Sequence, residues 1–324
     1  MKPLISFVTP MKEKDFRVIS MLKSIRSQNY PQNRIEILII DGGSNPEVLK
    51  ECKKYNVKIF NNPKMLAEGA GNGKDQGIWK SKGKYLVIAE SDIELIGNEW
   101  INRMIKPLEQ DKEIFASVPR VFVSKKDSAT NRYLSYVGVD PFAINRSIEG
   151  QIELNRKKMK ISDKGEYELV LMNKSLPFCM GSNGFMFRRD LIKEVGDYAQ
   201  DVEFIARLAR HNHTRFAILE NARIWHKNVK GLKDFLKKRL KWTKNYAKIY
   251  INEKKEFNWI PNRLDFFLTV FGNMLIIPQI PISIYKSIVY RDSAWLLHAP
   301  LIFISTFINI YYTLTSKNMF KQII

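Results

Sequence analysis

The chain has 324 residues, 45% of them hydrophobic and 27% charged, and is long enough for one globular domain of roughly 220 to 250 residues with an appendage. Its 53 Lys and Arg residues against 33 Asp and Glu give a net charge of +20. This balance favours an anionic partner: a nucleic acid, an anionic lipid surface or a phosphorylated substrate. The two cysteines, Cys52 and Cys179, lie far apart and indicate neither a disulfide framework nor a thiolate zinc site, which fits a reducing compartment.

The amino-terminal half alternates between strand-like and helix-like patterns. The apolar run at residues 4–9 is too short for a signal peptide core or a spanning helix, so we expect the main domain to stay in the cytoplasm. Further runs rich in Ile and Val at 35–40 and 85–89 are separated by stretches with helical apolar spacing, such as 17–27. Such alternation predicts an α/β fold with a mostly parallel, Rossmann-like sheet flanked by helices.

The middle of the chain is less regular. Residues 125–175 are polar and weakly periodic, as in an elaborated loop or an irregular subdomain. The pattern then returns, and it predicts a strand at 185–187, a helix at 201–211 and a strand at 215–219. No internal repeat is visible.

The character of the sequence changes near Gly231. Apolar residues at helical spacing among Lys and Arg predict a basic amphipathic helix at about 232–250, suited to an anionic cytoplasmic leaflet. The segments 266–285 and 294–314 are long and apolar enough to form a transmembrane hairpin, although prolines and polar residues in the first also allow a re-entrant or interfacial helix pair. We therefore expect a main domain at 1–230, the basic helix and a linker at 231–262, and the hydrophobic hairpin at 263–324.

Polar residues follow the first two predicted strands. The first ends in Thr9-Pro10, and the second ends in Asp41-Gly42-Gly43-Ser44. Ligands of parallel sheets bind at this carboxyl edge, where a carboxylate can accept hydrogen bonds from a base or ribose. Taken alone, Asp41 to Ser44 can equally be an ordinary strand-to-helix turn.

A glycine-rich stretch, Gly69-Ala70-Gly71-Asn72-Gly73-Lys74, opens a predicted helix. Its backbone N–H groups and the lysine suit a diphosphate, although Lys74 can also be a solvated helix lysine. A dinucleotide-binding glycine motif should follow the first strand, where none is present, and this counts against NAD.

Carboxylates and one histidine follow later strands. Glu90-Ser91-Asp92 places two carboxylates on one side of an extended segment, where they can hold a divalent cation; Asp92 can instead cap a helix. Asp201 begins a predicted helix, and His226 ends a predicted strand. In isolation they are an N-cap and a polar strand end, and their significance depends on the order of all the motifs.

This order resembles glycosyltransferase family 2, the inverting family with the GT-A fold, over residues 3–230. The resemblance implies an enzyme that transfers a sugar from a nucleotide diphosphate donor, UDP- or GDP-linked, with Mg²⁺ or Mn²⁺ as cofactor. It implies that Asp201 is the catalytic base and that Asp92 and His226 hold the metal. Asn183, in Gly181-Ser182-Asn183 ahead of Phe187-Arg188-Arg189, matches a further family segment. The implied donor-binding residues are Thr9, Pro10, Asp41, Gly43, Ser44, Gly71, Lys74, Glu90, Ser91 and Asn183.

Two positions depart from the family pattern. Glu90 and Gln200 stand where the family usually has Asp and Glu, respectively. A weakened metal site or a catalytically silent sugar-nucleotide binder therefore stays an alternative. The hydrophobic tail resembles those of members that act on lipid-linked acceptors, so we expect a glycan hydroxyl or a polyprenyl phosphate as acceptor and a location at the cell membrane with the catalytic domain cytoplasmic. A basic nucleic-acid-binding protein is the rival from another class, and we expect no nucleic-acid partner.

Overall fold

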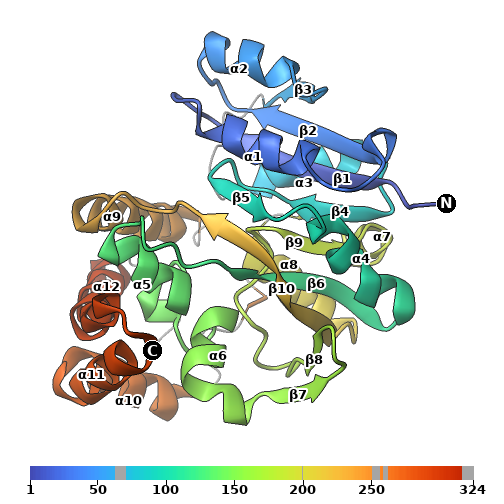
Figure 1. Cartoon of the computed structure of the whole chain (residues 1–324). Coiled ribbons are helices and arrows are strands. Elements are labelled where there is room, and N and C mark those ends of the chain that lie inside the picture. The colour runs from blue at the N-terminus through green and yellow to red at the C-terminus, as the bar shows by residue number, and fades with distance from the viewer. Residues whose placement is uncertain (63–70, 199, 250–255, 258–261, 316–324) are drawn as a thin grey trace. The chain divides into compact units, whose positions relative to one another are not determined.

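The computed structural model describes residues 1–62, 71–198, 200–249, 256–257 and 262–315. Two compact units make up the chain: unit 1 comprises Met1–Phe122 and Lys157–His226, and unit 2 comprises Val123–Arg156 and Lys227–Ile324. The structure thus groups residues 123–156 with the C-terminal helices, whereas the sequence prediction placed them within 1–230. Figure 1 shows both units.

Unit 1 is built on one sheet with the order β3-β2-β1-β4-β9-β6-β10-β8-β7, and β5 pairs with β10. The strands are β1 Ile5–Met11, β2 Ile35–Asp41, β3 Lys58–Asn61, β4 Tyr85–Ile88, β5 Ile93–Ile96, β6 Ile114–Val121, β7 Lys160–Asp163, β8 Glu168–Leu171, β9 Phe185–Arg188 and β10 Arg215–His226.

The predicted mostly parallel sheet is in fact mixed. β1 pairs parallel with β2 and β4, β2 with β3, and β6 with β10. β9 is antiparallel to both β4 and β6, and β10 is antiparallel to β5 and β8. The prediction was wrong for β9, β5 and β8, which run opposite to their neighbours, because apolar runs do not encode strand direction.

The helices of unit 1 are α1 Arg17–Arg26, α2 Pro46–Lys53, α3 Gly71–Lys80, α4 Trp100–Gln110, α7 Leu191–Val195 and α8 Asp201–Arg210, with short 3₁₀ turns η1 Gln32–Arg34 and η3 Arg156–Lys158. The apolar faces of α1 and α4 pack on the buried strands in one hydrophobic core. α3 lies very close to the sheet, because a Cβ atom on Gly77 would come within 2.4 Å of Val8 Cγ1. This close packing fixes the height of α3, and therefore of Lys74, over β1.

Unit 2 is helical. Its elements are α5 Ala129–Val137, η2 Pro141–Ala143, α6 Ile148–Asn155, α9 Leu232–Ile249, α10 Arg263–Met274, η4 Ile277–Gln279, α11 Ile280–Tyr290, η5 Ser293–Leu297 and α12 His298–Thr315. Tyr133 of α5 and Trp295 of η5 pack edge to face in its core. Arg132 binds Asp292 at 2.9 Å, which ties α5 to the loop before η5. Of residues 125–175, which the sequence left unresolved, 125–156 therefore belong to this helical unit and 157–175 belong to unit 1.

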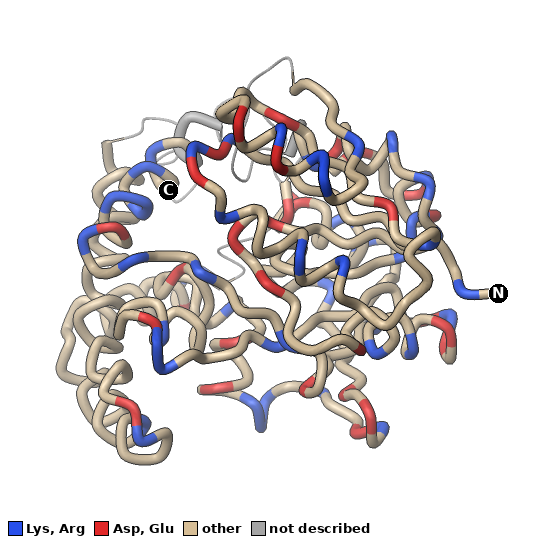
Figure 2. Tube along the Cα trace, turned by 45° about the horizontal axis from the view of Figure 1, so that its top comes forward, with Lys and Arg blue, Asp and Glu red and all other residues tan. Residues whose placement is uncertain are grey.

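The two apolar C-terminal segments do not form two straight membrane-spanning helices, because the first segment is bent. Ser293–Thr315 is long and apolar enough to cross a membrane, but α10 and the helix Ile277–Tyr290 meet at 83°. The prolines noted in this segment, Pro278 and Pro281, lie just after the bend, and Ile276 there has a positive φ of 59°. Within α10, α11 and α12 the charged residues are Arg263, Asp265 and Lys286, and the chain there is almost uniformly tan in Figure 2.

Candidate active site

The predicted motifs of unit 1 gather at the carboxyl ends of its parallel strands. β1, β2 and β4 are adjacent and parallel, so Pro10, Asp41 and Glu90 lie at or just beyond one edge of the sheet. Thr9 is different, because its side chain is fully buried and its hydroxyl lies 3.8 Å from Met21 Sδ in the core. Thr9 can therefore face a ligand only through its backbone.

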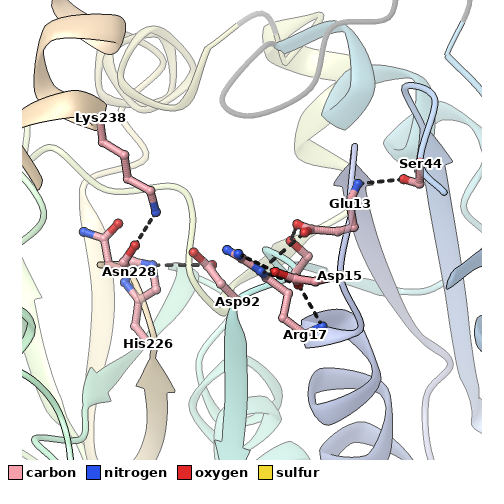
Figure 3. A network of polar contacts seen from close by, with 9 residues as sticks. Glu13, Asp15, Arg17, Ser44, Asp92, His226, Asn228 and Lys238 are labelled. Carbon is pink, nitrogen blue, oxygen red and sulfur yellow. Dashed lines mark hydrogen bonds and ion pairs between the residues drawn. The ribbon is translucent and has the colours of Figure 1, made fainter. Parts of the chain in front are cut away.

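The Asp41 to Ser44 segment is a hydrogen-bonded turn. Asp41 Oδ1 accepts a hydrogen bond from the Ser44 N–H at 2.9 Å, and Ser44 Oγ accepts one from the Glu13 N–H at 2.8 Å, as Figure 3 shows for the second contact. Gly43 has a positive φ of 101°, which glycine adopts without strain. The turn interpretation is thus confirmed, and a role of the same residues in donor binding stays a prediction.

Lys74 is the centre of a buried charge cluster. Its side chain is 1% exposed, and Nζ lies 2.7 Å from Glu90 Oε1 and 2.8 Å from Asp201 Oδ1. Burial by itself would lower the pKa of Lys74, but the charges of Asp201 and Glu90 outweigh it and hold the pKa above its usual value. The alternative of a solvated helix lysine is therefore wrong.

The same cluster affects Glu90. Burial raises its pKa, and the nearby Asp201 and Asp92 carboxylates act in the same direction, against the attraction of Lys74. The Glu90 side chain is thus engaged by the lysine. The Glu90 side chain is longer than the Asp usual at this position in the family, and it reaches Lys74 of α3. A role of Glu90 in donor binding stays a prediction.

Asp201 is held at the first turn of α8, where the helix dipole favours a negative charge. Lys74 of α3 binds its carboxylate, and Asp75 of α3 accepts a hydrogen bond from the Tyr198 N–H at 2.9 Å, just ahead of α8. Two consecutive residues of α3 therefore anchor the start of α8. The buried Tyr198 hydroxyl donates to the Gly181 carbonyl and completes the support.

Gly181 has a reason to be glycine. Its φ is +118°, and a Cβ atom there would lie 2.7 Å from the Tyr198 hydroxyl and 3.2 Å from Asp201 Cβ. The loop that contains Asn183 is itself docked on the sheet, because the Gly184 N–H donates to the Ile88 carbonyl at the end of β4. Asn183, with φ of 52°, thus lies near the strand end that precedes Glu90.

Asp92 and His226 are brought together by strand pairing. β5 begins one residue after Asp92 and pairs with the end of β10, with Ile93 opposite His226. His226 Nε2 lies 3.5 Å from Asp92 Oδ1, and Figure 3 shows the two side chains facing each other. Within the part of the chain that the structure describes, no group of three or more His, Cys, Asp or Glu residues could hold a metal ion. Asp92 and His226 thus form a pair of candidate ligands, and the described residues do not add a third His, Cys, Asp or Glu to it.

Sequence reasoning missed a polar group on the loop after β1. The Ser91 hydroxyl donates to the Glu13 carboxylate, and Arg17 lies 3.4 Å from Glu13 and 2.9 Å from Asp15. Figure 3 shows the Glu13, Asp15 and Arg17 side chains beside Asp92. Burial raises the pKa of Glu13, and the charges of Asp15 and Asp92 add to this against Ser91 and Arg17. Only the i, i+4 spacing of Glu13 and Arg17 was visible in the sequence.

Part of the glycine-rich stretch lies outside the described residues, namely Gly69 and Ala70, as do position 250 of the predicted basic helix and 316–324 of the predicted hairpin. Gly71 is the first residue of α3, so the predicted helix start is confirmed. Of the two cysteines, Cys52 is buried and Cys179 is half-buried.

Comparison with known proteins identifies the class of this fold and site. Residues 6–196 match the family described as Glycosyl transferase family 2. The chain belongs to this family and is a glycosyltransferase, as the sequence motifs predicted.

Among curated relatives, the chain is 34% identical to the glucosyl-3-phosphoglycerate synthase of Petrotoga mobilis over 101 residues, covering 30% of this chain and 31% of the relative. It is 24% identical to the glycosyltransferase AglE of Haloferax volcanii over 110 residues, covering 33% and 36%. The matched segments thus span about a third of each relative.

Solved structures share the fold. The mannosyltransferase PcManGT from Pyrobaculum calidifontis, solved with GDP-Man and Mn²⁺, superposes with a TM-score of 0.57 at 10% identity over 96% of this chain and 88% of that one. Residues 1–349 of TarS from S. aureus, solved with UDP-GlcNAc, give 0.50 at 13% identity over 98% and 92%. At such identities the likeness shows a GT-A-like α/β fold with a mixed sheet.

Proposed function

We propose that the protein transfers a hexosyl group, with inversion, from a UDP- or GDP-sugar to a hydroxyl group of a lipid-linked or membrane-proximal glycan. The observation that carries this proposal is the buried Lys74, which holds Asp201 at the start of α8 with Nζ 2.8 Å from the carboxylate. A carboxylate fixed in this way has little freedom to reorient, and this suits a general base that must meet one acceptor hydroxyl.

In the proposed reaction, the acceptor oxygen attacks the anomeric carbon while the bond from that carbon to the donor diphosphate breaks. Asp201 takes the proton from the attacking hydroxyl, and the nucleoside diphosphate leaves from the opposite face. Lys74 acts through Asp201 and is a positioning residue, because both of its carboxylate partners lie within 2.8 Å.

The residues present fit a divalent metal. Asp92 and His226 supply one oxygen and one nitrogen ligand 3.5 Å apart, and such a pair leaves coordination positions for diphosphate oxygens, as Mg²⁺ and Mn²⁺ require. When bound, the metal would stabilise negative charge on the departing diphosphate. The Mn²⁺ named for the mannosyltransferase neighbour supports this choice of cofactor.

The proposed class of sugar donor is supported by the same comparison with solved structures. GDP-Man and UDP-GlcNAc are named for two neighbours, which supports a nucleotide diphosphate sugar and leaves both bases as candidates. The residues that we propose at the donor are Asp41, Gly43, Ser44, Ser91 and Asn183, because Asp41 ends β2 and the others lie on loops at the same edge of the sheet.

The test is a thermal-shift panel on detergent-solubilised protein with UDP, GDP, several nucleotide sugars and NAD, each with and without Mn²⁺. We expect one nucleotide diphosphate to raise the Tm only with metal, and the shift to vanish in Asp92→Ala. Equal shifts in wild type and Asp92→Ala would refute the metal assignment. No shift with any nucleotide or nucleotide sugar would mean that the donor-site assignment is wrong, and a metal-dependent shift without detectable transfer would favour the silent sugar-nucleotide binder.

A polyprenyl phosphate is the second candidate acceptor, favoured by the apolar C-terminal helices of unit 2. Its oxygen is already ionised, so no base is required. Asp201→Asn separates the two: lost turnover with retained donor binding supports a hydroxyl acceptor, and near-normal turnover supports the phosphate. We further propose that the protein works at the cell membrane with its catalytic unit on the cytoplasmic side, where nucleotide sugars are made.

A further inference from the structure

Helices α10 and α11 carry their polar and apolar side chains on the opposite sides from those of a water-soluble helix pair. On α10, which the structure describes completely, only Asn273 is buried, and on α11 only Ser283. Beyond its first turn, the exposed side chains of α10 are mostly large and apolar. The large apolar ones follow one helical stripe: Leu264, Phe267, Leu268 and Phe271. α11 also exposes large apolar or aromatic side chains: Ile280, Ile284, Tyr285, Ile288 and Val289.

Three polar side chains near the bend, Asn273, Gln279 and Ser283, form hydrogen bonds within the unit. Asn273 Nδ2 donates to Thr306 Oγ1 at 3.4 Å, and Gln279 Nε2 donates to Asn273 Oδ1 at 3.3 Å. Ser283 Oγ accepts from the Ala299 N–H at 3.3 Å. In water, burial would favour the opposite arrangement. Polar groups paired inside and apolar groups outside are the arrangement that a lipid environment selects.

Neither helix can cross a bilayer. α10 has 12 residues and α11 has 11, so at about 1.5 Å per residue each is roughly 17 Å long, short of a hydrocarbon core of about 30 Å. The 83° bend prevents the two from acting as one straight span. Ile277, at the bend, is 73% exposed. The pair therefore has the shape of a wedge with an apolar tip.

Charged residues lie at both open ends of this pair. Arg263 and Asp265 begin α10, and Arg291 and Asp292 follow α11. Within the same unit, α12 packs against α9, α10 and α11. α9 carries seven Lys or Arg residues against the single acid Asp234. A cationic helix in the same packed unit as an apolar wedge complements a bilayer with anionic headgroups.

We propose that α10, η4 and α11 form a wedge that enters one leaflet of an anionic lipid bilayer, with Ile277 at its tip and both ends on the same side of the membrane. The proposal deepens, and rests on, the membrane association in the proposed function, and it is independent of the sugar chemistry. It replaces the first arm of the predicted transmembrane hairpin, which would place Arg263 and Arg291 on opposite sides.

Vesicle flotation of the detergent-purified full chain tests the surface. Phe271→Asp/Ile277→Asp should reduce the fraction bound to phosphatidylcholine–phosphatidylglycerol vesicles at least about tenfold, because each carboxylate would have to enter hydrocarbon. Leu171→Asp is the matched control, since Leu171 is 46% exposed in β8 of unit 1, and it should bind like wild type. Equal binding by the double variant and wild type would overturn the proposal. So would a wild-type protein that stays off vesicles and sediments as a dimer, because a second copy would then cover the wedge.

Cysteine labelling tests the topology. In a Cys52→Ala/Cys179→Ser background, Arg263→Cys and Arg291→Cys are placed singly and treated with a membrane-impermeant maleimide on sealed inverted membrane vesicles. Both positions should react from the same side, and Ile277→Cys should react only after detergent is added. Labelling of the two ends from opposite sides would establish a span and refute the wedge. Adding Asp201→Asn to each of these single-cysteine variants should leave its labelling pattern unchanged. The labelling therefore tests the wedge separately from the catalytic assignment of Asp201.

Discussion

Replacing Lys74 with Met removes one cation from between two carboxylates. Lys74 is 1% exposed, and its partners Glu90 and Asp201 are 20% and 27% exposed. Removing one partner of a buried ion pair leaves an uncompensated charge, at a cost of about 3 to 5 kcal/mol. Because the two carboxylates keep some access to water, we expect the lower end, about 3 kcal/mol, which corresponds to a fall in Tm of about 6 to 12 °C for a domain of this size.

The control is Lys54→Met. Lys54 Nζ lies 2.6 Å from Glu51, as close as the Lys74 contacts, but its side chain is 65% exposed. Solvent screens such a pair, so the Tm should stay unchanged within error. Differential scanning calorimetry of both variants in the same detergent measures the effect.

Turnover gives a second result for Lys74→Met. If Lys74 positions Asp201, kcat should fall by more than tenfold while the KM for the donor changes little, since the chemical step depends on the orientation of the base. A donor KM that rises sharply at unchanged kcat would mean that Lys74 binds the diphosphate directly. A Tm equal to that of wild type would refute the argument from burial.

Three further predictions address packing, titration and metal. Gly77→Ala should destabilise unit 1 by about 1 to 3 kcal/mol, because the new Cβ would meet Val8 Cγ1 at 2.4 Å. The control Gly231→Ala, where a new Cβ would have no atom within 4 Å, should leave the Tm unchanged. Equal Tm values for the two variants would contradict the close packing of α3 on β1. Burial raises the pKa of Glu13 above 4.5, so the native state binds the Glu13 proton more tightly than the unfolded chain does. This contribution to stability is lost as pH rises from about 4.5 through the folded pKa. Glu13→Gln should therefore flatten the dependence of Tm on pH in that window, and an unaltered dependence would exclude Glu13 as the cause. EDTA should abolish transfer, Mn²⁺ or Mg²⁺ should restore it in wild type and fail to do so in Asp92→Ala, and full activity in EDTA would remove the metal from the mechanism.

The sequence alone was sufficient for the local elements and for the class of enzyme. Apolar periodicity predicted the helix that becomes α1 and the strands β1, β2 and β4, and the glycine-rich stretch predicted the start of α3, because each depends on residues close together in the chain. The order of the acidic and glycine motifs indicated glycosyltransferase family 2, and residues 6–196 match that family. Strand-end residues such as Asp41 and Glu90 could be placed at one edge because parallel strands end together.

Tertiary structure decided which distant residues meet. Lys74 binds Asp201 across 127 positions of sequence, and Ser91 binds Glu13 across 78, through a strand order that no local pattern contains. The antiparallel entry of β9 and the break at Ile276 were likewise invisible or ambiguous in the sequence. Hydropathy reports that α10 and α11 are apolar, but only the packed helices show that their polar residues face inward. Composition fixes what a segment can bury, and the fold determines which side of it is buried.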